Sequence, residues 1–331
     1  MKPTGLIVVF VMGWAIAGCV PGWVQEDSPT DEDLYAVYGV AGGDVFAVGA
    51  NGTVLRRQNA KWHELDSGTE EDLYGVWGTS NELVVVVGDN CTALEYNGPI
   101  EPPEEGEPPP DLRELTVATC GDFRNLDGPT DGDRAFVVGE RTLSQWYDGS
   151  GLGNGRDFVE RMQGVSMIVN DEIHACGDYG AYYRKLDGSW SEREIIICGV
   201  DLVEGECPDG HEARPILWDV WVGSEGKGAV VGTFGGIWTI PPPLEGAWDM
   251  LATGFSTDLR AVHGYVDPNA KENKTTFYAV GSNGAMVRVS GPKIIREAPG
   301  THNNLYGVWT SENGSDIYAV GEAGTIIHMA K

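Results

Sequence analysis

One short phrase recurs seven times along this chain, and this repetition limits what the chain can fold into. The phrase is rich in β-branched and aromatic residues and ends in glycine; its seven terminal glycines are Gly49, Gly88, Gly139, Gly177, Gly232, Gly281 and Gly321. A unit of about 40 residues cannot bury its own apolar face, so successive units must stack on one another. The repetition therefore predicts a scaffold made of seven copies of one supersecondary unit.

Each unit has the pattern of short antiparallel strands. The clearest copy reads LYGVWGTSNELVVVVG from Leu73 to Gly88, and the last copy, from Leu305 to Gly321, matches it closely. A turn follows the terminal glycine and leads into another strand, as in GSNGAMVRV. The alternation of apolar and polar residues, with glycine at the turns, predicts strands of about five residues joined by tight hairpins. No later segment has sustained helical periodicity, so we expect an all-β protein.

The position of a fourth strand predicts how the units close into a ring. Trp62 lies 11 residues before Leu73, and Trp23 lies 11 residues before Leu34, although no repeat precedes Leu34. The last repeat ends after its third strand and lacks a fourth. We therefore expect a seven-bladed β-propeller with four-stranded blades, whose ring is closed by an N-terminal strand near Trp23.

Insertions distinguish some units from others. The longer ones are residues 98–112, 125–133 and 198–215, and a smaller polar extension spans residues 265–276. Loops on a rigid scaffold often carry recognition, but they also tolerate neutral change at little thermodynamic cost. Both interpretations stand for each insertion.

The N-terminus predicts export. Lys2 precedes an apolar run from Gly5 to Ala17 that is too short to span a bilayer and ends in small residues, which is typical of a signal peptide over residues 1–18. The ending Ile-Ala-Gly-Cys resembles the lipobox of bacterial lipoproteins, which implies cleavage before Cys19, diacylation of its sulfur and acylation of its new amine. The alternative is an ordinary secretory signal with an incidental cysteine.

The predicted domain organisation follows from this anchor. Residues 19–22 form the lipid anchor and a short tether, and residues 23–331 form a single propeller domain held close to the membrane. Val20 follows the cysteine where some inner-membrane lipoproteins carry Asp, so the resemblance favours the outer membrane, either periplasmic or surface-exposed.

The charge of the chain excludes one class of partner. The formal net charge is −28, from 22 basic and 50 acidic residues. Such a surface repels nucleic acid and anionic lipid. It suits a cationic partner or a calcium-rich exterior, and solubility alone explains it equally well.

Five cysteines follow Cys19. Cys198 and Cys207 bracket one insertion, so we predict a local disulfide between them in an oxidising compartment. A bond between Cys91 and Cys120 is a further candidate. The odd number leaves one thiol over, and Cys176 is the candidate because it replaces a core valine of the repeat.

Motifs for catalysis and metal binding are scarce, so the chain leans away from an enzyme, and no cofactor is predicted. The six histidines are scattered, and no nucleophile-elbow, zinc-protease or phosphate-loop motif occurs. Carboxylate pairs for glycoside hydrolysis stay open, because their spacing is spatial. Asp127, Asp131 and Asp133 are a weak calcium candidate against the alternative of a polar turn.

An aromatic series recurs four residues after the opening residue of five units. Its members are Tyr38, Trp77, Trp221, His263 and Trp309. On the innermost strands of successive blades they would form a ring of equivalent sites. One interpretation is packing between blades; the other is an aromatic-lined mouth for a peptide or a glycan.

The segments LYGVWT, DIYAVG and GTIIH between Leu305 and His328 resemble the repeat of exported bacterial propeller lipoproteins, which are similar to photosystem II assembly and stability factors and to BNR-type repeat proteins. The resemblance implies the fold, and its members include assembly factors. Our first hypothesis is therefore a membrane-anchored, non-enzymatic scaffold with a protein partner. The alternative is a carbohydrate-binding or sialidase-like glycoside hydrolase propeller. The oligomeric state is left open.

Overall fold

The computed structural model describes residues 22–40, 43–98, 110–141, 143–168, 172–198, 201–203, 212–240, 248–267, 269–271 and 275–330. Over these residues the protein is built from strands and one-turn 3-10 helices, which confirms the all-β prediction. No helix within these ranges is long and apolar enough to cross a membrane. The predicted signal peptide, Cys19 and Cys207 lie outside the described residues.

Seven antiparallel blades form the molecule, each with its first strand innermost. Blade 1 is β2 (Leu34–Gly39), β3 (Val45–Gly49), β4 (Val54–Gln58) and β5 (Lys61–Leu65). Blade 2 is β6 (Leu73–Ser80), β7 (Leu83–Gly88), β8 (Ala93–Tyr96) and β9 (Arg113–Glu114). Blade 3 is β11 (Phe123–Asp127), β12 (Ala135–Gly139), β13 (Ser144–Tyr147) and β14 (Gly151–Asn154), with β10 (Thr116–Val117) added in parallel outside β14. Blade 4 is β15 (Met162–Ile168), β16 (Glu172–Gly177), β17 (Ala181–Leu186) and β18 (Ser189–Glu194).

The remaining blades follow the same order. Blade 5 is β22 (Leu217–Val222), β23 (Gly228–Gly232), β24 (Ile237–Ile240) and β25 (Asp249–Met250). Blade 6 is β26 (Leu259–Val266), β27 (Thr275–Gly281), β28 (Met286–Ser290) and β29 (Lys293–Arg296). Blade 7 is β30 (Leu305–Thr310), β31 (Asp316–Gly321), β32 (Ile326–Ala330) and β1 (Val24–Gln25). A small sheet of β20 (Asp201–Val203), β19 (Ile196–Cys198) and β21 (Glu212–Ala213) lies along the chain between blades 4 and 5.

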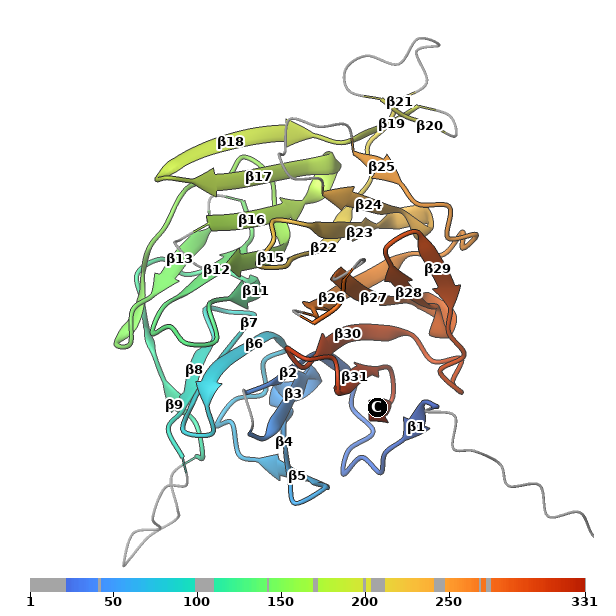
Figure 1. Ribbon diagram of the computed structural model, residues 1–331. Helices are drawn as coiled ribbons and strands as arrows, with labels where there is room; N and C mark the ends of the chain where they lie inside the picture. Colours follow the sequence, from blue (N-terminus) through green and yellow to red (C-terminus); the bar gives the residue numbers. More distant parts are fainter. Residues whose placement is uncertain are drawn as a thin grey trace, which may run out of the picture.

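The blades are arranged in a closed ring (Figure 1), and their innermost strands line a central channel. Each innermost strand contacts the innermost strand of the next blade, and β30 of blade 7 contacts β2 of blade 1. The seven-bladed propeller predicted from the repeat is therefore confirmed.

The predicted closure by the N-terminus is also confirmed. Strand β1 pairs antiparallel with β32, with Val24 opposite His328, and completes blade 7. The ring of Trp23 packs edge-on against Tyr278 of blade 6, with centroids 5.9 Å apart. The segment of Trp23 and β1 thus joins blade 7 to blade 6.

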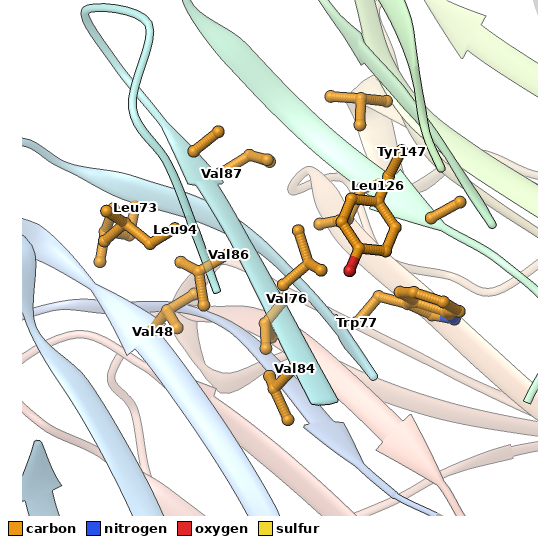
Figure 2. Packing of buried hydrophobic residues seen from close by; sticks show 14 of the residues in the cluster. Val48, Leu73, Val76, Trp77, Val84, Val86, Val87, Leu94, Leu126 and Tyr147 are labelled. Carbon is orange, nitrogen blue, oxygen red and sulfur yellow. The ribbon is translucent and has the colours of Figure 1, made fainter. Parts of the chain in front are cut away.

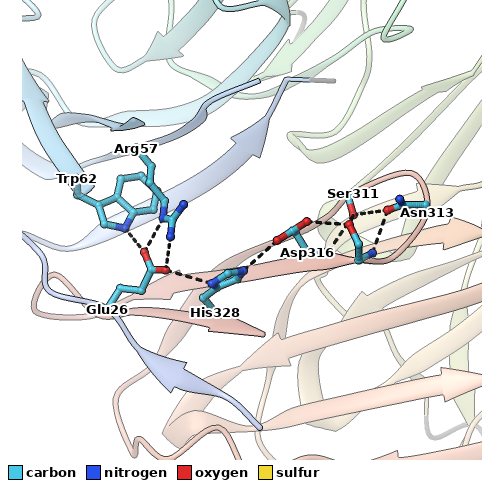
Figure 3. Close-up of polar contacts among 8 residues, drawn as sticks. Glu26, Arg57, Trp62, Ser311, Asn313, Asp316 and His328 are labelled. Carbon is cyan, nitrogen blue, oxygen red and sulfur yellow. Dashed lines mark hydrogen bonds and ion pairs between the residues drawn. The ribbon is translucent and has the colours of Figure 1, made fainter. Parts of the chain in front are cut away.

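Glu26, directly after β1, ties blade 7 to blade 1 (Figure 3). Its carboxylate accepts two hydrogen bonds of 2.8 Å from the Arg57 guanidinium and one of 2.7 Å from Trp62 Nε1. His328 Nδ1 lies 3.1 Å from the same carboxylate. Burial raises the pKa of Glu26, but the hydrogen bonds from His328, Arg57 and Trp62 outweigh burial and lower the pKa to about 2. We call these four residues the closure clasp.

The core lies between blades, because the middle strands are buried on both faces. Val84, Val85, Val86 and Val87 of β7 are each at most 1% exposed, and they pack against the neighbouring blades in the cluster that Figure 2 shows. Trp77 is fully buried there, and its indole N–H donates a 2.7 Å hydrogen bond to the carbonyl oxygen of Gly128 in blade 3. Removing a side chain of this kind costs about 3–5 kcal/mol of stability.

The channel has two distinct ends, since strands in a blade alternate in direction. One end of the channel is where each innermost strand begins, and we call it the entry end. It carries the turn between the second and third strands of each blade and the connection to the next blade. The other two turns of each blade lie at the far end. Insertions 98–112, 125–133 and 265–276 leave the blades at the far end, and 198–215 leaves at the entry end.

A repeated hydrogen bond joins blades at the entry end. Asp33, which precedes β2, accepts a 2.8 Å hydrogen bond from the Ala323 N–H of blade 7, and Asp72 accepts one of 3.0 Å from the Asn51 N–H of blade 1. Equivalent bonds join three further blade pairs. Each donor residue has a positive φ, so the carboxylate or amide stabilises a left-handed turn as well as the blade junction.

The cysteines agree with part of the predicted pattern. Cys91 and Cys120 form a disulfide with their Cα atoms 4.7 Å apart, as the second candidate pairing predicts. Cys176 is buried and unpaired among the described cysteines, and burial raises the pKa of its thiol. Cys207 is not described, so the Cys198–Cys207 disulfide stays a prediction.

Candidate functional site

The central channel is the candidate site, and a bulge repeated in every blade shapes its entrance. In blade 1, Leu34 pairs with Gly49 and Ala36 pairs with Val48, which leaves Tyr35 without a partner residue. The same shift occurs in the other six innermost strands. A bulge redirects a side chain. The seven bulged residues all line the channel, and we call them the entry ring: Tyr35, Tyr74, Arg124, Gln163, Trp218, Arg260 and Tyr306.

Aromatic and guanidinium groups of the entry ring contact each other around the rim. Tyr35 stacks on Tyr74 with centroids 5.0 Å apart and lies 5.7 Å from Tyr306. Arg124 lies 4.5 Å from the centre of the Tyr74 ring, and Arg260 lies 3.9 Å from the Trp218 ring. Such contacts hold the arginines in place at the rim.

Carboxylates behind the entry ring balance its positive charges. Arg124 forms ion pairs of 3.2 Å with Asp89 and 3.5 Å with Asp122, and Arg260 forms one of 3.2 Å with Asp258. Burial, followed by the nearby Asp89 charge, raises the pKa of Tyr74 to about 12, so its hydroxyl stays protonated. The rim therefore presents fixed, paired charges between aromatic surfaces.

A polar pair joins blades 3 and 5 one residue further along the innermost strands. At this position five innermost strands have Gly or Ala, whereas blades 3 and 5 have Asn125 and Asp219. Asn125 Nδ2 lies 3.4 Å from Asp219 Oδ1. Gly164 of the intervening blade 4 leaves the space, since a Cβ there would lie 2.5 Å from the Asp219 Cα.

Two carboxylates inside the channel have strongly raised pKa values. Asp219 accepts 2.9 Å hydrogen bonds from the Val220 and Val262 N–H groups, and Asp127 accepts one of 2.8 Å from the Met167 N–H. Burial outweighs these hydrogen bonds and raises the pKa of each carboxyl to about 7. No cationic side chain in the described residues is paired with either one.

The predicted aromatic series lies near the far end of the channel. We call the channel-lining residues at this level the floor ring: Tyr38, Asp127, Ser166, Trp221, His263 and Trp309. Trp77 has the equivalent position in blade 2 but does not line the channel. Sequence reasoning had missed that Asp127 and Ser166 complete the ring in blades 3 and 4. The channel from entry ring to floor ring has a volume of about 660 Å³.

Several floor-ring side chains also join successive blades. Ser166 Oγ accepts a 3.1 Å hydrogen bond from the Val222 N–H, and His263 Nδ1 accepts one of 3.1 Å from the Thr310 N–H. Burial lowers the pKa of His263 to about 4, so its ring is neutral. Packing between blades is therefore observed for this series, and a ligand-binding role stays a prediction.

A contact across the ring bridges the far end. Thr130 lies in the 125–133 insertion of blade 3, and its hydroxyl donates a 2.9 Å hydrogen bond to Glu312 in the β30–β31 turn of blade 7. These two turns come from opposite sides of the propeller. The insertion therefore reaches across the far end of the channel.

The three aspartates of the calcium candidate do not converge on one point. The Asp127 carboxylate turns toward the Met167 N–H, while Asp131 and Asp133 lie in the turn that follows. Among the described residues, no group of three or more His, Cys, Asp or Glu side chains is placed to hold a metal ion.

No protein-family model and no curated protein sequence matches the chain. Solved propellers match its fold. "YCF48 bound to D1 peptide" has a TM-score of 0.67 and 14% identity over 93% of this chain and 95% of that chain. YCF48 from Cyanidioschyzon merolae has a TM-score of 0.64 and 15% identity over 93% and 99% of the two chains. The WD40 propeller domain of Doa1 has a TM-score of 0.63 and 13% identity over 94% and 97%. The chain thus has the propeller fold of these proteins.

Proposed function

We propose that this chain is an exported, lipid-anchored propeller that serves as a non-enzymatic scaffold for protein interactions at the bacterial cell envelope. The observation that carries this proposal is the entry ring, in which identical bulges hold aromatic and arginine side chains around the open end of the channel. Aromatic residues and arginine are enriched in the energetically dominant parts of protein interfaces.

Two exposed aromatic residues extend this surface at the entry end. Tyr179 and Phe234 are 53% and 68% exposed, and both occupy turn positions with positive φ. The equivalent positions in blades 1 and 6 hold Asn51 and Asn283, which tolerate this conformation better than an aromatic residue does. The Phe234 N–H bonds Asp258, the partner of Arg260, which places this turn beside the entry ring. An apolar anchor next to paired charges suits a protein partner.

The structural neighbours support the same role. One YCF48 structure is described as bound to D1 peptide, so a propeller of this architecture has a peptide ligand. At 14% identity the likeness assigns no binding residue here.

The proposed anchor places the scaffold at the membrane. If Cys19 is acylated, only four residues separate it from the closing strand β1, which begins at Val24. The propeller would then sit close to the lipid surface, with Val20 favouring the outer membrane. Mass spectrometry of the mature N-terminus should find an acylated Cys19; an unmodified start at Val20 or Gln25 would refute the anchor.

Crosslinking on intact cells, followed by identification of captured proteins, tests the scaffold role. One envelope protein should be enriched with the native chain and lost with Phe234→Asn and with Trp218→Ala. Ile294→Thr is the matched control, because Ile294 is an exposed apolar residue on the outer strand of blade 6. Capture that is unchanged in both test variants would contradict an entry-end interface.

The hydrolase alternative rests on Asp127 and Asp219 in the channel. Glycoside hydrolysis needs one carboxyl kept protonated and one ionised, so their pKa values must differ. Here burial raises both to about 7, and both carboxylates already accept backbone N–H groups. Release of fluorophore from 4-methylumbelliferyl glycosides, abolished by Asp127→Asn or Asp219→Asn, would establish the alternative instead.

A further inference from the structure

The floor ring combines features that a cation recognises. Four of its members form an arc of neighbouring rings: Tyr38 and Trp309 centroids are 6.3 Å apart, Trp309 and His263 are 6.4 Å apart, and His263 and Trp221 are 6.0 Å apart. Asp127 of blade 3 lines the same channel, and its charge acts on the Tyr38 hydroxyl. Aromatic rings and a carboxylate around one space attract organic cations, through the negative faces of the rings and through charge.

Positive charge is confined to the other end of the channel. The lining arginines are Arg124, Arg161 and Arg260, and all three lie at the start of their innermost strands. The floor ring contains no Lys or Arg, and its one histidine is neutral at pH 7. The floor ring therefore has no cationic side chain, and its one acidic member, Asp127, is negatively charged above pH 7.

Tyr38 adds a polar group to this wall. The side chain lines the channel and is only 8% exposed, and its hydroxyl has no hydrogen-bond partner among the described residues. Burial, and then the charges of Asp127 and Glu312, raise the pKa of this hydroxyl. The hydroxyl oxygen is accessible from the channel, so it can bond water or a bound group.

We propose that the floor ring binds an alkylammonium group, with Asp127 as its counter-ion and the aromatic members as its wall. The group enters from the entry end, because the Thr130–Glu312 contact bridges the far end. The channel volume of about 660 Å³ lies in the range of roughly 300–1,000 Å³ typical of ligand sites. The group is either a free alkylammonium ion or a lysine side chain of a bound protein, and the test below distinguishes the two.

Isothermal titration of the purified chain tests this site with matched probes. Choline and its neutral isostere 3,3-dimethylbutan-1-ol differ in charge but hardly in shape. Choline should bind at least about tenfold more tightly, because only the cation gains the ring and carboxylate attraction. Nα-acetyl-lysine methylamide and its trimethylated form are the second arm. Preference for choline identifies a free ligand, and preference for a lysine derivative identifies a protein-borne one.

Two variants and one control locate the binding. Asp127→Asn should weaken binding of the better probe about tenfold, and Tyr38→Phe about threefold, since the latter removes only a hydroxyl. Asp131→Asn should leave binding unchanged, because Asp131 is exposed in the same turn. Melting temperatures of all variants establish that each is folded.

Three outcomes would overturn the site. The first is equal affinity for choline and its neutral isostere. The second is native affinity in both folded variants, Asp127→Asn and Tyr38→Phe, and the third is no saturable binding of any probe up to millimolar concentration. None of these would affect the scaffold proposal, which depends on the entry ring and Phe234. Conversely, a Phe234→Asn variant that no longer captures the envelope protein should still bind choline with native affinity.

Discussion

Replacing Glu26 by Gln should destabilise the closed ring. The substitution keeps the shape of the side chain but removes the negative charge that faces the Arg57 guanidinium, whose side chain is only 20% exposed. Hydrogen bonds to charged groups contribute about 1.5–3 kcal/mol each, and Gln retains part of the hydrogen bonding to Arg57 and Trp62. We expect the free energy of unfolding to fall by about 2 kcal/mol at neutral pH.

The pKa of Glu26 gives a second estimate of how much its charge stabilises the folded protein. It lies at about 2 in the folded protein against 4.5 for the free group, and each unit corresponds to about 1.4 kcal/mol, so the ceiling on the contribution of the charge is roughly 3–4 kcal/mol. Partial exposure of the clasp lowers this ceiling toward the estimate above. Because the folded pKa is the lower one, the contribution is fully present above pH 4.5 and is lost as the pH falls toward 2.

Thermal unfolding at pH 7 and pH 3 is the assay. With an unfolding entropy of about 2.1 cal/mol/K per residue over roughly 300 residues, a loss of about 2 kcal/mol lowers the melting temperature by about 3 °C. At pH 3 the difference should shrink to less than half of this value. Glu160→Gln is the control: its partner Arg141 is 65% exposed, so we expect a change below about 1 °C. An equal effect of Glu26→Gln at both pH values would refute the reasoning.

Three further predictions concern the channel and the closure. Gly164→Ala places a Cβ 2.5 Å from the Asp219 Cα and should lower the free energy of unfolding, measured in urea, by about 1–3 kcal/mol. Gly153→Ala is the control: its Cβ would have no contact closer than 3.9 Å, so the loss should be under about 1 kcal/mol. Equal losses in the two variants would contradict the close packing of blades at Gly164. Burial raises the folded pKa values of Asp127 and Asp219 to about 7, above the unfolded value of 3.8, so both carboxyls add stability as the pH falls from 8 to 5, whereas His263, with a folded pKa of about 4, opposes them. Between pH 8 and pH 5 the melting temperature of Asp219→Asn should therefore gain less than that of the native chain, and an equal change in the two proteins would argue against titration of Asp219. Trp23→Ala should lower the melting temperature and expose the N-terminal segment to proteases, and unchanged protease resistance would count against a closing role for Trp23.

The repeat predicts much of the fold because each unit is a local structure with a strong pattern. The terminal glycines count the blades, and the interval from Trp23 to Leu34 locates the closing strand, since a missing fourth strand must come from the other end of the chain. The aromatic series was also correctly placed on the innermost strands. These inferences need only local periodicity and the requirement that no sheet edge stays open.

The entry ring could not be predicted from the same pattern. Strict alternation places every second residue on one face, and the bulge at Tyr35 and its equivalents breaks that alternation in all seven blades. The Asn125–Asp219 pair and the Thr130–Glu312 contact join units that are far apart in sequence, so no local signal encodes them. Alignment of the units at their opening residue does single out Asn125 and Asp219, as polar residues where the other copies have Gly or Ala.

The pairing of β1 with β32 has a consequence for the order of events during synthesis. Strand β1 is synthesised long before its partner β32, so the edges of both stay open until β32 has left the ribosome. Closing a loop of about 300 residues in a flexible chain would cost roughly 5 kcal/mol of entropy, and docking of successive blades shortens the gap before β1 is captured. Ring closure therefore follows the synthesis of β32, and an exported chain would complete it only after β32 has crossed the membrane. Until then, the exposed edge of β32 is the part of the molecule most open to pairing with another chain.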